Sequence, residues 1–515
     1  MIPDPPQLIA SIVQTSPETM RRQARSALDR GADLVELRLD YLHQPTAESI
    51  RTLAAEFHNR CVCTLRPADQ GGRYDGPETE RINLLHAAAA GNPRFIDFEY
   101  ARIAENAAHP DEIPRGTDGL IVSHHDFIGP PSDPTRLAND IAAIPHCAIT
   151  KLAWAAQDVA ENFRALDLLR TTSTPTIALC MGRAGLLSRV LGRKFGAAAT
   201  YCSVDVGSES APGQPTLDDM RECFRWHHID SDTDLFGLIG WPVAHSLSPD
   251  IFNAAFQHHN INAVYLPLPV RPGPEAFTQF LNAVLERPWL GLQGLSVTLP
   301  HKQNAFRNCS PPTDPSARRS EAVNTLKFDG PQTEGTNTDA PAAIASIAHT
   351  MQCTIEELSG IDVDLLGAGG VARSIAAALA HAGCNVTIYN RTPQRADQLA
   401  RFCRARSAPW QSRTDRRGRI LINCTSVGMW PDVNESPIPA HALDPELTVF
   451  DTVYNPPQTR LLTDAAARGC RTLPGMDMFI RQAALQFEAW TARPAPTEIM
   501  KRAAQAALAR FAEKS

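Results

Sequence analysis

The residue with the clearest chemical potential in this sequence is Lys151, which stands inside an otherwise apolar run, Cys147–Trp154. Burial there would disfavour the ammonium form and leave a neutral amine that can attack a ketone. The same lysine could instead extend to a solvated rim or pair with a carboxylate, and taken alone it favours that interpretation. His125 changes the balance, because it lies in the preceding apolar run, Leu120–Phe127, and imidazole is suited to removing protons near neutral pH. The pair predicts a nucleophile beside a base.

A glycine-rich turn in the second half of the chain has the spacing of a phosphate-binding loop. It reads Gly367-Ala-Gly369-Gly370-Val-Ala372 and follows the apolar strand Val363–Leu366. Small residues at the start of a helix let its backbone N–H groups approach a pyrophosphate. Glycine-rich turns are common, so it is the strand before and the helix after that indicate a dinucleotide site.

The residues about 20 positions further on distinguish NAD from NADP, because an NAD site needs a carboxylate there for the ribose 2′-hydroxyl. Here the next strand ends in Asn390-Arg391-Thr392, with Arg395 close by, and arginine suits a 2′-phosphate. A solvated basic turn would explain the same residues, but the glycine loop favours NADP. The cofactor-binding residues predicted from the two segments are Gly367, Gly369, Gly370, Ala372, Asn390, Arg391, Thr392 and Arg395.

Eight short apolar runs in the first part of the chain predict the strands that hold Lys151 and His125. They are Leu8–Val13, Asp33–Asp40, Cys61–Arg66, Phe95–Glu99, Leu120–Phe127, Cys147–Trp154, Thr176–Gly182 and Ala199–Asp205. Segments with helical periodicity, such as Pro17–Arg30 and Asp158–Leu169, lie between them. This alternation predicts a (β/α)8 TIM barrel, whose active site lies at the C-terminal ends of the strands. Polar residues do gather at those ends: Glu36, Arg38, Arg66, Glu99, His125 and Lys151.

Beyond the polar stretch Asp230–Asp234, the pattern of strands and helices begins again at Leu235. A βαβ series starts at Val363 and continues through the strand Asn385–Asn390, which predicts a Rossmann domain. The tail Met478–Glu513 is rich in alanine and helical in composition.

Composition excludes several classes of protein. The net charge of −7 gives no support for a nucleic-acid-binding surface, and no apolar run approaches the length of a membrane span. The N-terminal segment lacks the basic region and apolar core of a signal peptide, so we expect a cytoplasmic protein. The 12 cysteines form no C-x-x-C pair and there is no H-E-x-x-H motif, so we expect reduced thiols and no metal.

The first half resembles the type I dehydroquinate dehydratases. The matching pieces run in family order: Glu36-Leu-Arg38-Leu-Asp40, Cys63-Thr-Leu-Arg66, Gly71-Gly72, Ser123-His-His-Asp-Phe127, Lys151, Met181-Gly182, Ser188-Arg189 and Ser210-Ala-Pro-Gly-Gln214. The resemblance implies that Lys151 forms a Schiff base with the substrate C3 ketone and that His125 moves the C2 proton. It also implies that Arg189 holds the substrate carboxylate. The remaining residues expected to position substrate hydroxyls and catalytic groups are Glu36, Arg38, Arg66, Ser210 and Gln214.

One position departs from the dehydratase pattern. The family usually has Glu-Gly-Gly after the third strand, whereas here Gln70 precedes Gly71-Gly72. In the family that glutamate is thought to orient the catalytic histidine. An amide carries no charge to stabilise an imidazolium, so we predict reduced or pH-shifted dehydration.

The second half resembles the shikimate dehydrogenases over its whole length. The pieces are Gly240-Trp-Pro-Val-Ala-His-Ser246-Leu-Ser248-Pro, Ser296-Val-Thr298-Leu-Pro-His-Lys302, Ala322-Val-Asn324-Thr, Asn337-Thr-Asp339, Asn423-Cys-Thr425-Ser-Val-Gly-Met and Gly475-Met-Asp-Met478 with Gln482. The resemblance implies a catalytic pair, Lys302 and Asp339, whose alternative would be an ordinary surface ion pair. It implies that Ser246 and Ser248 bind the substrate carboxylate. The other residues that it implicates are Thr298, Asn324, Tyr454 and Gln482 for substrate, and Thr425, Gly475 and Met478 for cofactor.

These resemblances divide the chain into four parts. We predict a dehydratase barrel over residues 1–228, a substrate-binding domain over 234–340, a Rossmann NADP-binding domain over 341–475, and C-terminal helices over 476–515 that return to the substrate-binding domain. The substrates expected are 3-dehydroquinate, 3-dehydroshikimate and shikimate, with no nucleic-acid or membrane partner.

Three alternatives remain open. The barrel could be impaired, through Gln70, so that only the dehydrogenase works. Quinate could be the second substrate, although serine at both Ser246 and Ser248 favours shikimate. The chain could also be a metabolite-sensing relative without chemistry, which the retention of Lys151 and Lys302 opposes.

Overall fold

The computed structural model describes residues 6–105, 109, 112–244, 246–312, 314–330, 332–415 and 418–513. The chain forms two compact units. Unit 1 comprises Met1–Thr233 with Asn262–Pro269, and unit 2 comprises Asp234–Ile261 with Val270–Ser515.

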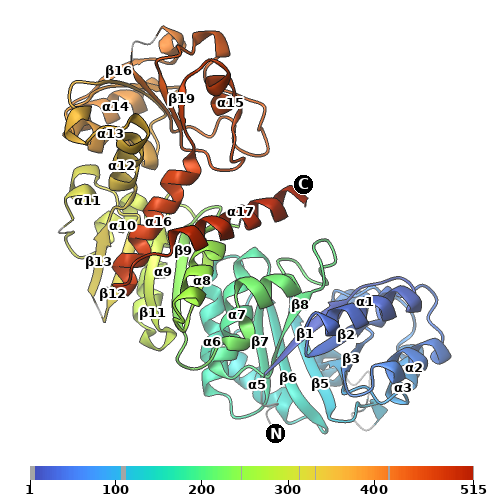
Figure 1. Ribbon diagram of the computed structural model, residues 1–515. Coiled ribbons are helices and arrows are strands. Elements are labelled where there is room, and N and C mark those ends of the chain that lie inside the picture. The colour runs from blue at the N-terminus through green and yellow to red at the C-terminus, as the bar shows by residue number, and fades with distance from the viewer. Residues whose placement is uncertain are drawn as a thin grey trace. The chain divides into compact units, whose positions relative to one another are not determined.

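Unit 1 is a parallel barrel surrounded by helices (Figure 1). Its strands are β1 (Gln7–Ile12), β2 (Leu34–Arg38), β3 (Cys61–Thr64), β4 (Phe95–Glu99), β5 (Gly119–Asp126), β6 (Cys147–Ala155), β7 (Thr176–Met181) and β8 (Ala199–Ser203). The eight predicted apolar runs are thus confirmed as strands, with ends that differ by a few residues. The helices are α1 (Pro17–Asp29), α2 (Ala47–Glu56), α3 (Glu78–Ala89), α4 (Tyr100–Ala104), α5 (Pro134–Ala142), α6 (Asn162–Thr171) and α7 (Leu186–Leu191).

The strands pair in the order β7-β6-β5-β4-β3-β2-β1-β8, so β7 and β8 lie at the two ends of the ladder. The Ala198 N–H donates to the Thr176 carbonyl at 2.8 Å and joins these ends at their start. We call this junction of β7 and β8 the seam. Every residue of β2, β3, β4, β7 and β8 is buried, because helices cover one face and the barrel interior the other.

Helix α1 shows how the sequence sets these elements. The Ser16 side chain accepts from the Thr19 N–H and caps the N-terminus, and Pro17 occupies the first turn. Met20, Ala24 and Ala27 follow at four- and three-residue steps and are all buried against the barrel.

Unit 2 contains two sheets. The first has its strands in the order β9-β11-β12-β13, with β9 and β11 parallel and the last two strands antiparallel to their neighbours. The strands of this region are β9 (Asp234–Gly240), β10 (Ala263–Pro269, in the segment assigned to unit 1), β11 (Leu292–Val297), β12 (Thr325–Asp329) and β13 (Gln332–Thr336). Its helices are α8 (Ser248–His258), α9 (Pro274–Leu285), α10 (Lys302–Asn308), α11 (Pro315–Ser320) and α12 (Asp339–Met351).

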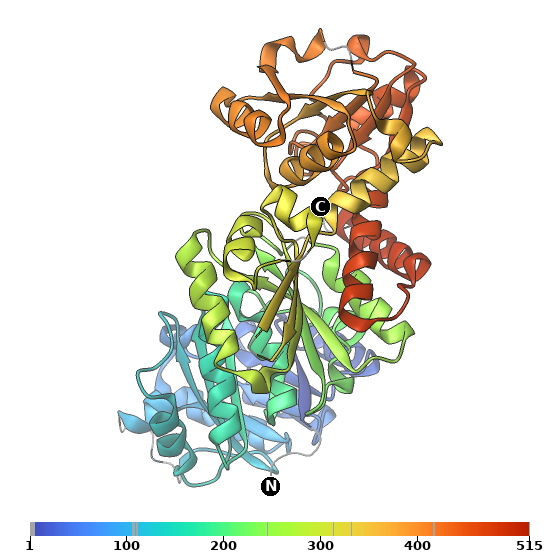
Figure 2. The same ribbon diagram turned by 90° about the vertical axis from the view of Figure 1, so that its left-hand side faces the viewer.

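The second sheet of unit 2 is parallel and doubly wound. Its order is β16-β15-β14-β17-β18-β19, so the chain reverses direction after the third strand, as in a Rossmann domain. Figure 2 shows helices on both of its faces. The elements are β14 (Asp362–Leu366), α13 (Gly370–His381), β15 (Asn385–Asn390), α14 (Pro393–Cys403), β16 (Arg406–Pro409), β17 (Ile420–Asn423), β18 (Thr448–Asp451), α15 (Arg460–Ala467) and β19 (Arg471–Leu473).

The chain ends in two long helices, α16 (Gly475–Thr491) and α17 (Thr497–Glu513). Helix α16 packs against α12, and α17 lies along α8, where Arg510 pairs with Asp250 (Figure 1). The predicted boundary at residue 341 falls inside α12, and the one at residue 476 falls at the start of α16. No helix of the described residues is both long and apolar enough to cross a membrane.

Candidate active sites

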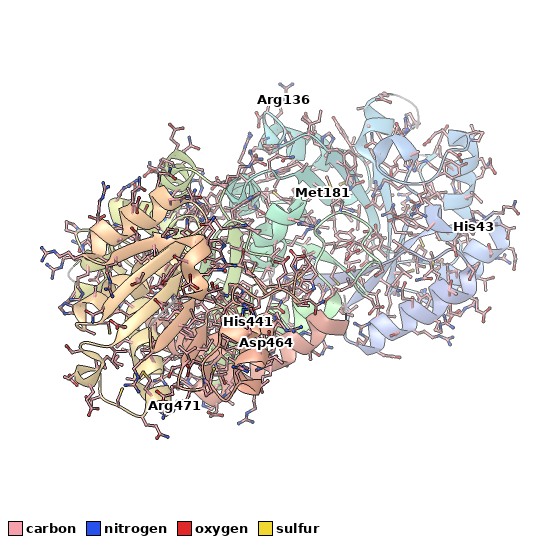
Figure 3. The ribbon with its side chains drawn as sticks, turned by 90° about the horizontal axis from the view of Figure 1, so that it is seen from above. His43, Arg136, Met181, His441, Asp464 and Arg471 are labelled. Carbon is pink, nitrogen blue, oxygen red and sulfur yellow. The ribbon has the colours of Figure 1, made fainter. Side chains whose placement is uncertain are left out.

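A pocket opens among the strands of the barrel. It is lined by all eight barrel residues that the sequence predicted for the site: Glu36, Arg38, Arg66, His125, Lys151, Arg189, Ser210 and Gln214. The other lining residues are Gln70, Gly71, Phe127, Ala153, Leu179, Met181, Tyr201 and Ala211. In the view from above, Met181 lies inward of Arg136, which is on the outside of the barrel (Figure 3).

Lys151 is 5% exposed, and its amine has two neighbours. The Nζ atom donates to Oδ2 of Asp97 at 2.9 Å, and it lies 4.1 Å from the centroid of the Tyr201 ring. The burial that the sequence predicted is therefore real, but Asp97 provides a counter-ion for the ammonium form. The sequence analysis did not single out this carboxylate.

Asp97 belongs to a buried chain of charges that runs outward from the pocket. Arg66 donates to Asp97 at 2.8 Å and to Glu99 at 2.7 Å, and Glu99 also accepts from Arg81 of α3. Burial alone would raise the pKa of the Asp97 carboxyl, but Arg66 and Lys151 outweigh it and hold that pKa well below the usual range. Asp97 is thus ionised, and it fixes Arg66 and Lys151 relative to each other.

Arg189 lies in the seam and differs from the other cations of the pocket. Its guanidinium donates to the carbonyls of Cys180 in β7, at 3.1 Å, and Tyr201 in β8, at 3.4 Å. It is 2% exposed and forms no ion pair with any described carboxylate, whereas Arg38 and Lys151 each have one. Burial lowers the pKa of Arg189 to about 10. A buried cation without a carboxylate counter-ion is suited to bind an anionic ligand.

The other predicted residues Arg38, Ser210, Gln214 and Glu36 already have hydrogen-bond partners in the barrel. The Arg38 guanidinium donates one hydrogen bond to each carboxylate oxygen of Asp40, at 2.9 and 2.8 Å. The side-chain oxygen of Gln214 accepts from the Ser210 backbone N–H and hydroxyl, at 3.0 and 3.1 Å. Glu36 accepts from the hydroxyls of Ser11 and Thr64. The pocket is therefore organised before any ligand enters it.

The His125 ring has one nitrogen that forms no hydrogen bond with the described residues. Its Nδ1 is buried and has no hydrogen-bond partner, and its ring stacks on Phe127 with 6.4 Å between centroids. Burial, together with the charges of Arg66 and Lys151, keeps the pKa of His125 well below its usual value. The imidazole is neutral at physiological pH, which is the form that accepts a proton.

Gln70 lines the same pocket as His125 and ends a short helical turn, Ala68–Gln70. The two glycines that follow are required by their surroundings. Gly71 has φ +76°, and a Cβ on it would meet the Phe127 ring at 2.5 Å, while a Cβ on Gly72 would meet the Arg66 carbonyl at 2.0 Å.

In unit 2, Lys302 and Asp339 form a buried ion pair, 7% and 5% exposed respectively, which excludes a surface pair. Lys302 begins α10 and Asp339 begins α12. The second oxygen of Asp339 accepts from the Asn324 amide at 2.9 Å. The side-chain oxygen of Asn324 accepts from the Thr338 N–H at 2.8 Å, so Asn324 holds the loop that carries Asp339.

The other predicted substrate residues lie on several elements of unit 2. The Ser246 hydroxyl donates to Ser248 at 3.1 Å and also hydrogen-bonds Tyr454. Burial raises the pKa of Tyr454, whose ring stacks on Phe479 of α16. Gln482, one turn along α16, donates to the Phe479 carbonyl at 2.9 Å.

Thr298 follows β11, where its N–H donates to the Ile239 carbonyl at 2.9 Å. Gln486 was not among the residues predicted from the sequence. It is 2% exposed and links the Ser296 hydroxyl to the backbone carbonyl of Asn324. The sequence feature that could have predicted Gln486 is a glutamine on the buried face of an alanine-rich helix.

The glycine loop opens α13 and comes close to this pair. A Cβ on Gly370 would lie 3.6 Å from the Lys302 side chain, and one on Gly369 would meet nothing within 4 Å. Gly367 has φ +107°, and a Cβ on it would meet the Cys424 carbonyl at 2.8 Å. The open space at Gly369 and the free helix N-terminus fit a pyrophosphate. Arg391 and Arg395 are exposed beyond the neighbouring strand β15, as a 2′-phosphate requires.

The remaining predicted cofactor residues have local packing roles. Asn390 donates to the Thr392 carbonyl at 2.9 Å, and Thr425 donates to Asn423 at 2.7 Å. Ala372 and Met478 lie in the hydrophobic core of the Rossmann sheet. A Cβ on Gly475 would meet the Val453 carbonyl at 2.5 Å, so glycine is needed for α16 to approach β18. Their contact with a cofactor stays a prediction.

The twelve cysteines are all free. Among the residues described, no three His, Cys, Asp or Glu side chains gather as metal ligands would.

Models of four families match successive parts of the chain. They are the type I 3-dehydroquinases at residues 8–231, the shikimate dehydrogenase substrate-binding domain at 238–326, the shikimate/quinate 5-dehydrogenases at 349–416 and the shikimate 5′-dehydrogenase C-terminal domain at 475–505. The chloroplastic bifunctional 3-dehydroquinate dehydratase/shikimate dehydrogenase of Arabidopsis thaliana is 35% identical, over 97% of this chain and 84% of the relative. The chain belongs to this bifunctional dehydratase/dehydrogenase family.

Separate relatives of the dehydrogenase half are also known. The NADP(+) shikimate dehydrogenase of Moorella thermoacetica is 38% identical over 54% of this chain and 95% of the relative. A crystal structure of a shikimate dehydrogenase in complex with NADP+ superposes with a TM-score of 0.50 and 32% identity, over 54% of this chain and 97% of that one. The Rossmann order of the second sheet agrees with this family.

Proposed function

We propose that the chain catalyses two successive steps, in which the barrel dehydrates 3-dehydroquinate to 3-dehydroshikimate and the second half reduces that product to shikimate with NADPH. One observation carries the first step. The pocket combines a buried lysine with a neutral histidine and an arginine that has no described carboxylate as counter-ion, and these groups suit a ketone, an acidic C–H bond and a carboxylate.

In the barrel, the Lys151 amine attacks the C3 ketone and releases water to form an imine, which is an electron sink when protonated. His125 takes the proton from C2, and the electron pair moves into the protonated imine to form an enamine. The enamine then returns this pair to form the C1–C2 double bond as the C1 hydroxyl departs. The same imidazolium then gives this proton to the departing C1 hydroxyl, which leaves as water. Arg189 binds the carboxylate, and hydrolysis of the imine restores Lys151. Asp97 keeps the amine in place between turnovers. The residues proposed to position substrate are Glu36, Arg38, Arg66, Ser210 and Gln214.

In the dehydrogenase half, bound NADPH supplies the hydride. Lys302 stabilises the negative charge that develops on the carbonyl oxygen and provides its proton, and Asp339 fixes the ammonium. Ser246 and Ser248 are proposed to bind the carboxylate, close to Tyr454. Thr298, Asn324 and Gln482 are proposed to contact hydroxyls.

The decisive experiment gives the purified protein only 3-dehydroquinate and NADPH, with a Lys151→Ala variant alongside. Loss of NADPH with the native protein and not with the variant is the expected result. If added 3-dehydroshikimate consumes NADPH while 3-dehydroquinate does not, the dehydration proposal is wrong.

A second candidate function is that of a dehydrogenase with an impaired barrel. Nδ1 of His125 has no hydrogen-bond partner among the described residues, and Gln70, which lines the same pocket, carries no charge; both observations favour it. The same experiment separates the two, because an impaired barrel would leave 3-dehydroquinate untouched. The remaining alternative is quinate as the substrate of the dehydrogenase half. Comparing NADP+ reduction with quinate and with shikimate tests it.

We further propose the four-part division at residues 1–228, 234–340, 341–475 and 476–515, and a cytoplasmic location without nucleic-acid or membrane partners. The packing of α17 along α8 supports the return of the C-terminal helices. Cell fractionation that finds the protein with membranes or in an organelle would contradict the location.

A further inference from the structure

Two polar atoms of the barrel pocket are buried without a hydrogen-bond partner in the described structure, Nδ1 of His125 and the hydroxyl of Tyr201. The first belongs to the proposed base. The second belongs to a residue with no role in the proposed mechanism. Tyr201 is 4% exposed, so water at the surface does not satisfy its hydroxyl.

A buried hydroxyl without a partner is unfavourable, because it has lost its hydrogen bonds to water and gained none. Phenylalanine would fill the same space without that cost. When such a group lines a ligand pocket, the missing partner is one that a ligand can supply.

The position of Tyr201 places it beside both ends of the proposed substrate. Its ring lies 4.1 Å from Nζ of Lys151, which is proposed to bond to C3. Its carbonyl accepts from Arg189, which is proposed to bind the carboxylate on C1. A substrate held by both groups must therefore lie close to Tyr201.

The phenol is also in the right state to donate. Burial raises the pKa of Tyr201 well above its usual value, and the carboxylates of Glu36 and Asp97 act in the same direction. The hydroxyl therefore keeps its proton through the neutral range.

We propose that Tyr201 is a substrate-binding residue of the barrel, whose hydroxyl hydrogen-bonds a ring hydroxyl of the bound polyhydroxy acid while its ring supports the Lys151 amine. This inference rests on the proposed dehydration, since it assumes the same substrate and the same attachment points.

Tyr201→Phe removes only the hydroxyl, and Thr200→Val is its matched control. Thr200 precedes Tyr201 in β8, is 2% exposed, and its hydroxyl is also buried without a partner. Successive residues of a strand face opposite sides, and Thr200 does not line the pocket. Both variants therefore lose one unsatisfied hydroxyl, but only one of them loses it inside the site.

Without ligand, both variants should unfold at or above the temperature of the native protein. With 3-dehydroquinate, kcat/KM for dehydration should fall about five- to tenfold in Tyr201→Phe alone, mainly through KM, as expected for one hydrogen bond between neutral groups. The rise in unfolding temperature that 3-dehydroquinate causes should shrink in the same variant. Borohydride trapping of 3-dehydroshikimate on Lys151 should persist in both variants, which shows that their barrels are folded.

An unchanged kcat/KM and an unchanged ligand-induced thermal shift in Tyr201→Phe would overturn the inference. An equal loss in both variants would also overturn it, because it would indicate a structural effect of β8. If the native protein neither dehydrates 3-dehydroquinate nor traps an adduct, the proposed function fails. The inference is then decided by the thermal shift alone, and a shift equal in the native and variant proteins overturns it.

Discussion

Each half of the molecule buries a lysine against an aspartate, yet the two pairs have different surroundings. Asp97 accepts from Lys151, Arg66 and Ser123, whereas Asp339 accepts from Lys302 and the uncharged amide of Asn324. If Lys151 loses its proton, Asp97 still has Arg66 as a counter-ion. If Lys302 lost its proton, the described structure would offer Asp339 no other cation. The first arrangement suits a lysine that must become a nucleophile, and the second suits one that stays charged until the substrate oxygen takes its proton.

The largest effect should come from Asp97→Asn, because it leaves Arg66 and Lys151 in the barrel without their shared carboxylate. Removing one partner of a buried ion pair costs about 3–5 kcal/mol of folding free energy. We expect loss of dehydration and a clear fall in the stability of the barrel, measured by urea unfolding. Asp339→Asn is the matched variant, and it should abolish the reduction with a smaller loss of stability. Equal losses in both variants would remove the distinction drawn between the pairs.

Arg189→Lys should have the next largest effect. It keeps a positive charge but cannot donate to two strand carbonyls and a carboxylate together. A hydrogen bond to a charged group contributes about 2 kcal/mol, so KM for 3-dehydroquinate should rise about thirtyfold. Steady-state dehydration kinetics measure this, and the reduction of 3-dehydroshikimate by the same variant should be unaffected. An unchanged KM would mean that the carboxylate binds elsewhere.

In the dehydrogenase half, Arg391→Ala should raise KM for NADPH about fivefold, because an exposed cation that binds a phosphate contributes about 1 kcal/mol. KM for NADH, which lacks the 2′-phosphate, should not change. Arg401→Ala, at the other end of α14, is the control for a general loss of charge. A parallel rise for both cofactors would contradict the proposed NADP contact.

The smallest effect is expected from Gln70→Glu, which places a carboxylate in the pocket that His125 also lines. His125 must be neutral to accept a proton, so activity falls as the pH drops through its pKa. The low pKa of His125 keeps the native enzyme active into mildly acidic solution. A carboxylate favours the imidazolium and raises that pKa, so the acidic limb of kcat/KM should move to higher pH. Gln70→Ala adds no charge and should leave the limb in place. Identical profiles for native protein and Gln70→Glu would refute the role given to position 70.

The two halves also differ in how far their sites could be predicted from sequence. In the barrel, polar residues such as Arg66 and Lys151 interrupt apolar runs near their ends, and one fold rule places those ends together. Asp97 was missed because it lies in the middle of β4, whose residues are all buried and show no alternation. Tyr201 was missed because an aromatic residue in a buried strand carries no polar signal.

The dehydrogenase pair could not be placed by periodicity. Lys302 and Asp339 begin different helices, and the loop anchored by Asn324 brings them together. Only resemblance to known motifs identified them. The order of the Rossmann strands likewise depends on crossovers between distant segments, which local patterns do not encode.

The seam gives the substrate a second role. Its junction at Arg189 contains a cation with no counter-ion among the described residues, so local opening between β7 and β8 should be the easiest fluctuation of the empty barrel. A bound carboxylate would supply the missing charge and suppress that opening. Amide hydrogen exchange in β7 and β8 should therefore slow more than in β3 and β4 when 3-dehydroshikimate is added. Bound 3-dehydroshikimate therefore stabilises the junction of β7 and β8, and its cellular concentration sets how often these two strands separate.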